Sequence, residues 1–266
     1  MLSNFHTHTI YCDGKSTAEE IVQSAIKKGF DAIGFSGHGF TDHDLSYCMK
    51  DTVKYLSEVR ELAKEYSDRI EVYAGVEEDA SFLLDRTEYD FIIGSFHYVK
   101  KNGIYHAIDC SMEGFNKCLE VFEGDHITMA KTYFDEFCTY INTRRPDIVG
   151  HFDLLTKYDE KNDFSYSEDP EYNRLAEAYI ESVADTGCIF EVNTGAISRG
   201  YRTNPYPAEN LLYVLKKHGT DLILNSDSHF YDTIDCNFNE TRAFLKDMGF
   251  KTLMTMSNGE FIRCQI

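Results

Sequence analysis

At 266 residues, the chain is long enough for one large α/β domain or two small ones. Hydrophobic residues make up 42% of the sequence, and 4 Pro and 17 Gly are too few for a disordered or fibrous chain. The formal net charge of −19 argues against a basic surface for nucleic acid or anionic lipid, so we expect a globular protein without either partner.

Strand-like apolar runs alternate with amphipathic helical segments along the whole chain. After the first run, the capping box Thr17-x-x-Glu20 predicts a helix start, and apolar residues at helical spacing continue to Gly29. Helices are also predicted over 53–66, 169–187 and 211–219, and two are expected in the long crossover 98–146, one of them over 129–141. The seven predicted strands are 2–5, 32–35, 70–75, 91–95, 147–150, 188–193 and 221–225.

This alternation predicts parallel strands joined by right-handed crossovers, which is an α/β fold. No linker, low-complexity stretch or repeat interrupts it, so residues 1–266 are predicted to form a single domain. Eight scattered cysteines without a CxxC pair, no secretory signal and no apolar run near the ~20 residues of a membrane helix indicate a cytoplasmic protein with reduced thiols. The sequence leaves the oligomeric state open.

Histidines and carboxylates recur just after the predicted strands. Because the carboxyl ends of parallel strands open on one face of a barrel or doubly wound sheet, side chains far apart in sequence would meet there. The candidates, six histidines and three acidic residues, are His6, His8, Asp13, His38, Glu77, His97, His151, Asp227 and His229.

Each candidate has an ordinary structural explanation when it is taken alone. Asp13-Gly14 is a favoured turn pair, and Glu77 could belong to a solvated acidic face. His97 and His151, as single histidines, could lie in the core or on the surface. Their shared position at strand ends favours a metal or catalytic site over these separate explanations.

The ligand types restrict the metal. Imidazole with carboxylate and no organised thiolate suits Zn, Mn or Fe and disfavours Ca. One ion needs three or four protein ligands, so nine candidates indicate two or three divalent ions. A carboxylate such as Glu77 could bridge neighbouring ions about 3.5–4 Å apart.

Several motifs resemble the polymerase and histidinol phosphatase (PHP) family. They run from His6-Thr7-His8-Thr9 through Gly94-Ser95-Phe96-His97 to Ser226-Asp227-Ser228-His229, so the resemblance covers essentially the whole chain. Tyr11-Cys12-Asp13-Gly14, Gly150-His151-Phe152-Asp153-Leu154 and Glu191-Val192-Asn193-Thr194 are similar to the stand-alone histidinol-phosphatase branch. The resemblance implies a distorted seven-stranded (β/α)7 TIM-like barrel. It also implies hydrolysis of L-histidinol phosphate to L-histidinol and phosphate, in histidine biosynthesis, by a metal-activated hydroxide.

The same resemblance implies a trinuclear site. Many family members have a histidine where this chain has Asp13, which leaves the occupancy of the third ion open. Matched by position, the ligands would be His6, His8, Glu77 and Asp227 for one ion, Glu77, His97 and His151 for the second, and Asp13, His38 and His229 for the third.

Substrate contacts are less constrained by the sequence. Arg199, between Gly195 and Gly200 in a predicted loop, is the candidate phosphate clamp, because guanidinium binds phosphate through two parallel hydrogen bonds. An ordinary surface arginine is the alternative. Asp13 and His43 are the candidate proton donors to the leaving group, and His43 and Arg202 are further substrate-binding candidates, with Lys100 a lesser option. Recognition of the imidazole and amino group could fall to any of Asp44, Asp109, Phe152 and Tyr158.

Two alternatives to a small-molecule phosphatase stay open. The same metal site could act on nucleotides or short oligonucleotides, although the strong negative charge disfavours a long polynucleotide. The chain could instead be a non-catalytic metal-binding barrel. Loss of chemistry would be expected to remove ligands, and every expected position is filled.

Overall fold

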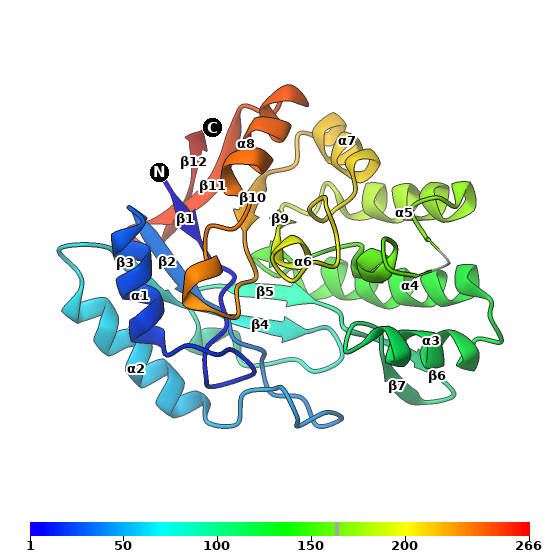
Figure 1. The fold of residues 1–266 in the computed structure, drawn as a ribbon, viewed down its shortest axis with the longest axis horizontal. Coiled ribbons are helices and arrows are strands. Elements are labelled where there is room, and N and C mark those ends of the chain that lie inside the picture. Colours follow the sequence, from blue (N-terminus) through cyan, green and yellow to red (C-terminus); the bar gives the residue numbers. More distant parts are fainter. Residues whose placement is uncertain (163–164) are drawn as a thin grey trace.

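The computed structural model describes residues 1–162 and 165–266 (Figure 1). Its helices are α1 (Ala18–Lys27), α2 (Thr52–Glu65), α3 (Met112–Val121), α4 (His126–Arg144), α5 (Pro170–Val183), α6 (Gly195–Ser198), α7 (Glu209–His218) and α8 (Phe238–Asp247). The strands are β1 (Ser3–Asn4), β2 (Ala32–Phe35), β3 (Glu71–Ala74), β4 (Val76–Asp79), β5 (Ile92–Ser95), β6 (Tyr98–Lys101), β7 (Ile104–Ala107), β8 (Ile148–Val149), β9 (Ile189–Asn193), β10 (Leu222–Asn225), β11 (Thr252–Ser257) and β12 (Glu260–Gln265).

The fold is α/β with parallel sheets, as predicted. In the described residues, β1, β2 and β3 form one parallel sheet, and β10, β9, β8, β5 and β4 form a second. Each of the seven predicted strands contains one of these strands. The additional strand is β4, so Glu77 lies within a strand and not after one. Gly75 separates β3 from β4, and a Cβ there would lie 2.3 Å from the Phe91 ring.

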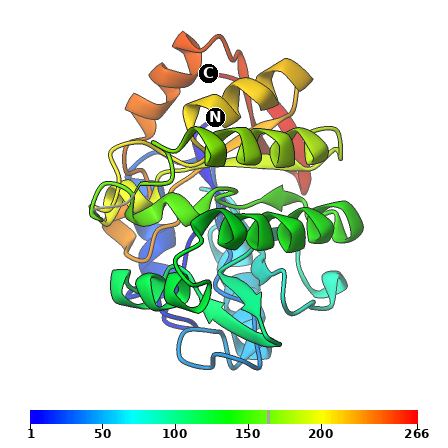
Figure 2. The same ribbon diagram turned by 90° about the vertical axis from the view of Figure 1, so that its right-hand side faces the viewer.

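The predicted helices are present, and their ends have physical causes. Thr17 caps α1 with the reciprocal capping box to Glu20, and Pro170 occupies the first turn of α5. The crossover 98–146 contains the two expected helices, α3 and α4, but the hairpin β6–β7 precedes them. Figure 2 shows α4, α5 and α7 side by side on one face of the molecule, and α5 contacts both of its neighbours.

The interior between the strands is apolar toward their amino ends. A small buried cluster takes residues from strands of both sheets and from β11, among them Phe5, Phe91, Ile148, Ile223 and Met256. The hairpin β11–β12 therefore contributes to the core close to the chain's start, where both termini lie (Figure 1). Polar side chains are left for the carboxyl ends of the strands. Among the described residues, no helix has the length and apolar character to cross a bilayer.

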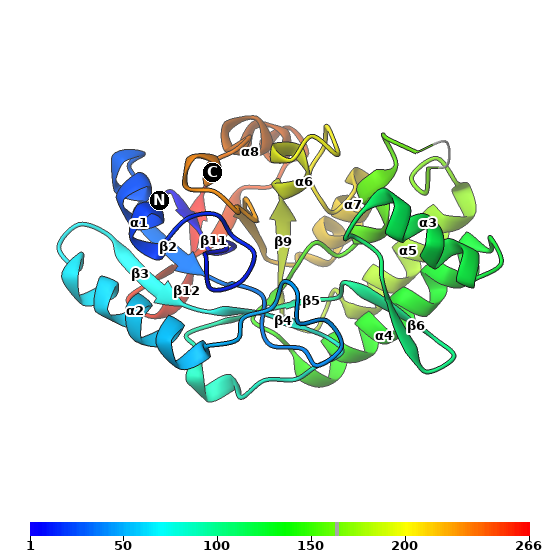
Figure 3. The ribbon, with the colours of Figure 1, turned by 60° about the horizontal axis from the view of Figure 1, so that its bottom comes forward.

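The loops that leave those carboxyl ends lie near one another. Figure 3 shows the segments after β1 (dark blue), β2 (blue) and β10 (orange) around one region. A parallel bridge joins Thr7 to Ser228, and another joins His38 to Glu77. The backbone N–H of Lys15 also donates to the carbonyl of His229 at 2.8 Å. These contacts bring the predicted ligand segments together.

Candidate metal centre

Glu77, which points inward from β4, is the centre of the cluster. One carboxylate oxygen, Oε1, lies 3.0 Å from Nε2 of His151 and 3.3 Å from Nε2 of His97. The other, Oε2, lies 2.8 Å from Nδ1 of His38 and 3.4 Å from Nε2 of His6. Nε2 of His8 lies 3.7 Å from the same Oε2, so one buried carboxylate contacts five imidazoles that follow four different strands.

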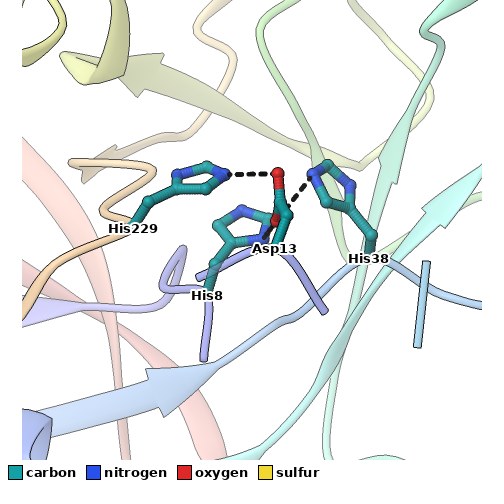
Figure 4. A group of neighbouring side chains, drawn as sticks. All are labelled: His8, Asp13, His38 and His229. Carbon is teal, nitrogen blue, oxygen red and sulfur yellow. Dashed lines mark ion pairs between the residues drawn. The ribbon is translucent and has the colours of Figure 1, made fainter. Parts of the chain in front are cut away.

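A second carboxylate, Asp13, lies among three imidazoles (Figure 4). Its Oδ1 is 3.8 Å from Nδ1 of His8 and 3.7 Å from Nε2 of His38, and its Oδ2 is 3.3 Å from Nε2 of His229. The rings of His8 and His229 stack with centroids 4.0 Å apart. Asp13 follows β1 by a turn, and the stacking fixes the rings around its carboxylate.

All nine predicted ligands belong to groups that could hold a metal ion. Within each group the donor atoms lie within 4.8 Å of one another, and the groups share members, so neighbouring ions could share ligands. The groups are His8 with Asp13, His38 and His229; His6 with Glu77 and His151; His6 with His8 and Asp227; and His38 with Glu77 and His97.

Unpaired polar atoms test whether these residues suit a metal. In the described part of the chain, Nε2 of His6, Nε2 of His8 and Oε2 of Glu77 are buried without a hydrogen bond of good geometry, although Nδ1 of His38 lies 2.8 Å from that oxygen. Leaving such an atom unpaired costs about 1–3 kcal/mol, more for a charged group. Three of them facing one another at 3.4 and 3.7 Å form a donor set that divalent cations would satisfy. The residues fit Zn, Mn or Fe.

The electrostatics of the cluster agree with this fit. Burial alone would raise the pKa of Glu77, but the imidazoles of His6, His38 and His97 outweigh it and hold that pKa well below its ordinary value. Burial lowers the pKa of His6, yet Glu191, Glu77 and Asp227 raise it well above 6.5. Without metal, positive imidazolium therefore compensates the buried carboxylates.

Backbone conformation aims the last acidic ligand. Asp227 has a φ of +46°, a left-handed conformation that Asp tolerates better than most residues. Its Oδ1 lies 3.2 Å from Nε2 of His8. A Cβ on Gly195 would lie 2.7 Å from Oδ2 of Asp227 and 3.0 Å from an Arg199 nitrogen. Glycine at position 195 therefore lets the carboxylate and the guanidinium approach each other.

Two buried carboxylates outside the predicted ligand set orient the histidines. Glu191, in the middle of β9, accepts a hydrogen bond from Nδ1 of His6 at 2.7 Å, and Asp79 accepts one from Nδ1 of His97 at 3.0 Å. Such partners fix the ring and the tautomer of a metal-ligating histidine. An acidic residue inside an apolar strand was the available signal for Glu191. For Asp79 it was the two-residue spacing from Glu77, which places both on one strand face.

The cluster opens onto a cavity of about 330 Å³. Arg199 lines it, and its Nη2 donates to Oδ2 of Asp227 at 2.9 Å. Lys157 and Asp109, which are not among the predicted metal ligands, line the same cavity. The cavity therefore joins the metal-ligating side chains to a guanidinium, which is the composition expected of an anion site.

The other substrate candidates lie elsewhere. Arg202 is not among the residues that line this cavity; its guanidinium lies 4.4 Å from the centre of the Tyr206 ring and bonds to Thr156, and it lines a separate cavity. His43 bonds to Ser81 at 2.7 Å and stacks on Tyr105.

The remaining candidates differ in their access to the cavity. Lys100 lies over the Tyr105 ring, and Phe152 is buried between Phe134 and Phe137 in the core. Asp44 and Asp109 both line the cavity.

A parallel α/β fold with a histidine and carboxylate cluster at the carboxyl ends of its strands defines a class of metal-binding proteins. The sequence model of the PHP domain family matches residues 4–195. That match spans more than half of the chain, so the chain belongs to the PHP family, as the motifs predicted.

Curated relatives match over most of their length. A Schizosaccharomyces pombe protein named "Probable histidinol-phosphatase" is 28% identical, with 96% of this chain and 89% of the relative covered. The Bacillus subtilis histidinol-phosphatase is 24% identical over 84% of this chain and 92% of the relative. The crystal structure of histidinol phosphate phosphatase from Lactococcus lactis, complexed with zinc, L-histidinol and phosphate, has a TM-score of 0.72 and 20% identity, with 98% of each chain covered. The two folds are therefore alike.

Proposed function

We propose that this chain is a metal-dependent histidinol-phosphatase that hydrolyses L-histidinol phosphate to L-histidinol and phosphate in histidine biosynthesis. The observation that carries the proposal is the convergence of the nine ligand-type side chains around a cavity that also presents Arg199. The names of the relatives and the zinc, histidinol and phosphate in the Lactococcus structure support the substrate and the cofactor class.

Two or three divalent ions, Zn, Mn or Fe, are proposed for the cluster. The shared donor groups support the assignment of Asp13, His38 and His229 to one ion, to which the structure adds His8 as a neighbour. When bound, such ions act as Lewis acids on a phosphoryl oxygen and lower the pKa of coordinated water to about 7. For the other ions we propose the ligand sets of the family, His6, His8, Glu77 and Asp227, and Glu77, His97 and His151. The donor groups that support them are His6 with His8 and Asp227, His6 with Glu77 and His151, and His38 with Glu77 and His97.

The chain's own contribution to the reaction is the binding and orientation of the phosphate. Arg199 is held by Asp227 through its Nη2 and through the Asp227 carbonyl, which accepts from Nη1 at 2.9 Å. These bonds leave other guanidinium N–H groups for a phosphate in the cavity. We assign the phosphate to Arg199 and not to Arg202 or His43, because neither of these two residues lines the cavity.

Asp13 suits a ligand role better than proton donation. Burial raises the pKa of its carboxyl, but the hydrogen bond from His229 and the nearby His38 and His8 lower it further, below its ordinary value. A carboxylate that stays ionised can bind a cation but has no proton for the leaving alkoxide. We therefore propose that solvent, and not Asp13, protonates the leaving alkoxide.

We also propose that the two sheets close into one seven-stranded barrel within a single domain, 1–266. The parallel bridges Thr7–Ser228 and His38–Glu77 support closure at the two junctions, and β3 and β4 would then count as one strand interrupted at Gly75. All eight cysteines are free thiols, which supports the expected cytoplasmic location.

Phosphate release from L-histidinol phosphate tests the proposal. The purified chain, stripped with a chelator and then reloaded with Mn or Zn, is expected to release phosphate only when reloaded. Nucleoside monophosphates and a short single strand, assayed in parallel, are expected to react far more slowly. Equal turnover of the nucleotides would favour the nucleotide alternative, and stoichiometric metal without turnover of any ester would favour a non-catalytic barrel.

A further inference from the structure

The cavity in front of the cluster has a second wall that phosphate hydrolysis itself does not use. This second wall consists of the lining residues other than the cluster and Arg199, and it includes Asp44, Asp109, Lys157 and three tyrosines, Tyr47, Tyr98 and Tyr201. The phosphate of a bound ester must face the ligands, so the organic half of the ester must face this wall. Its chemistry should therefore match that half.

Each of the two carboxylates on this wall has one oxygen engaged within the protein and, in the described part of the chain, one oxygen that accepts no hydrogen bond. Oδ1 of Asp44 accepts from the backbone N–H of Ser46 at 2.9 Å and from the Ser46 hydroxyl at 2.6 Å. Oδ2 of Asp109 is 3.4 Å from Nζ of Lys157, and in the described part of the chain Oδ1 of Asp109 accepts no hydrogen bond. The Asp109 side chain is 26% exposed. Asp109 thus offers a free acceptor to the cavity.

Asp109 is also held in place from behind. Nζ of Lys157 and the hydroxyl of Tyr158 both donate to the backbone carbonyl of Asp109, each at 2.7 Å. The segment is fixed after β7 by these two bonds, and Lys157 is itself 10% exposed. A carboxylate fixed through its backbone loses little freedom when it binds a ligand, which favours selective recognition.

The cluster influences the ionisation of Asp109. Burial raises the pKa of this carboxyl, but Lys157, His97, His151 and His38 lower it further, below its ordinary value. The carboxylate is therefore ionised and within electrostatic reach of three ligand imidazoles that line the same cavity. A ligand that spans this gap meets positive charge at one end and negative charge at the other.

We propose that Asp109 is a specificity residue, which binds a cationic nitrogen of the substrate while Arg199 and the cluster hold its phosphate. The inference rests on the proposed function and names the class of ester that the site prefers: a phosphate monoester carrying an ammonium or imidazolium group. An ester without a cation would leave the Asp109 carboxylate facing apolar or neutral atoms, which costs binding free energy.

Asp109→Asn tests the anchor, and Asp44→Asn is the matched control in the same wall. The substrates are L-histidinol phosphate, the uncharged alkyl ester 3-phenylpropyl phosphate, and p-nitrophenyl phosphate, whose leaving group needs no proton. Loss of a charge-assisted hydrogen bond predicts a fall of about 10- to 100-fold in kcat/KM for L-histidinol phosphate, mainly through KM. The other two esters should be unaffected, and metal content should equal that of the wild type.

Two further esters identify the nitrogen. O-Phosphoethanolamine carries only the ammonium, and 3-(imidazol-4-yl)propyl phosphate carries only the imidazole. The ester whose kcat/KM falls in Asp109→Asn names the group that Asp109 binds. Equal losses on all esters, a loss on both alkyl esters but not on the aryl ester, or a loss of selectivity in Asp44→Asn alone would each overturn the assignment. The second of these outcomes would indicate proton donation.

Binding of L-histidinol to the metal-loaded protein separates this inference from the proposed reaction. Calorimetry is expected to show binding that weakens by about 10- to 100-fold in Asp109→Asn. Such binding without any phosphatase turnover would support the anchor and refute the reaction. Turnover of L-histidinol phosphate with histidinol affinity unchanged in Asp109→Asn would refute the anchor alone.

Discussion

Replacement of Glu191 by Gln is the most direct perturbation of the support behind the metal ligands. Oε1 of Glu191 accepts from Nδ1 of His6 at 2.7 Å and from Nδ2 of Asn225 at 3.0 Å. Oε2 accepts from the backbone N–H of His151 at 2.9 Å and from Nδ2 of Asn193 at 2.9 Å. One carboxylate thus connects the ends of four strands, and all of its partners are donors.

A glutamine amide has one acceptor and one donor group, so in either orientation two of these donors face an NH₂ group. Hydrogen bonds to a charged group are worth about 1.5–3 kcal/mol each, and the loss of two predicts about 3–6 kcal/mol. The side-chain amides of Asn193 and Asn225 cannot flip without losing another hydrogen bond. Oδ1 of Asn193 accepts from the backbone N–H of Gly195, and Oδ1 of Asn225 accepts from the backbone N–H of Phe5. Measured against a total stability of about 5–15 kcal/mol, the variant should fold with a greatly lowered melting temperature.

The metal should also bind more weakly. If the NH₂ group faces His6, the ring can accept only by moving its proton to Nε2, the nitrogen that faces Glu77. Loss of such an orienting partner typically costs about 10- to 100-fold in metal affinity. Competition with a chromophoric chelator measures that affinity, and thermal unfolding measures the stability.

Glu78→Gln supplies the control. Glu78 is equally buried on β4 but accepts from Tyr140 at 2.7 Å and from Arg144 at 2.9 and 2.8 Å, outside the cluster. It should destabilise the fold and leave metal affinity unchanged. Wild-type metal affinity in Glu191→Gln, or an equal loss in both variants, would refute the reasoning.

Further predictions concern the ligands and the clamp. Glu77→Ala should lose bound metal and activity, measured by metal analysis and phosphate release. Full activity in this variant would refute the assignment of Glu77 as a metal ligand. Arg199→Ala should raise KM for the ester about 10- to 100-fold at unchanged metal content. Wild-type kinetics in this variant would refute phosphate binding by Arg199. Metal binding at pH 7 should release protons, detected by calorimetry in buffers of different ionisation enthalpy, because His6 and His97 have pKa values well above 6.5. Since His38 also has a raised pKa, these imidazoles stabilise the metal-free fold below pH 6.5. The Tm after chelation should therefore fall as pH rises above 6.5, and a flat profile would contradict this.

The strands and the metal ligands could be predicted because the sequence patterns that indicate them do not depend on the conformation of the loops. Buried strands are apolar runs, and parallel strands bring their carboxyl ends together whatever the connections do. The hairpins were missed although each has an Asn-Gly turn, Asn102-Gly103 and Asn258-Gly259, with positive φ at both residues. β7 and β12 are partly or largely exposed, so neither has the alternation of buried apolar residues that predicts a strand.

Side-chain direction in loops was the part that sequence could not supply. Arg199 and Arg202 are three residues apart, yet Arg199 lines the cavity of the cluster and Arg202 lines a different cavity. The short helix α6 and the turn that follows it set this difference, and no periodic pattern encodes it. The same limit applied to Asp44 and Asp109, because only the structure shows that Lys157 and Tyr158 fix the backbone of Asp109 beside the cavity.

Strand β4 explains how the cluster can exchange ions for protons without loss of the fold. Glu77 and Glu78 are consecutive, so one points to the cluster and the other to α4, where Arg144 pairs with it at 2.8 Å. This outer pair fixes the register of β4 independently of the cluster. On the inner side, raised histidine pKa values supply protons that compensate Glu77 when metal is absent. The metal-free protein should therefore keep its ligands close to their metal-bound positions, so that metal replaces protons in a site that is already assembled.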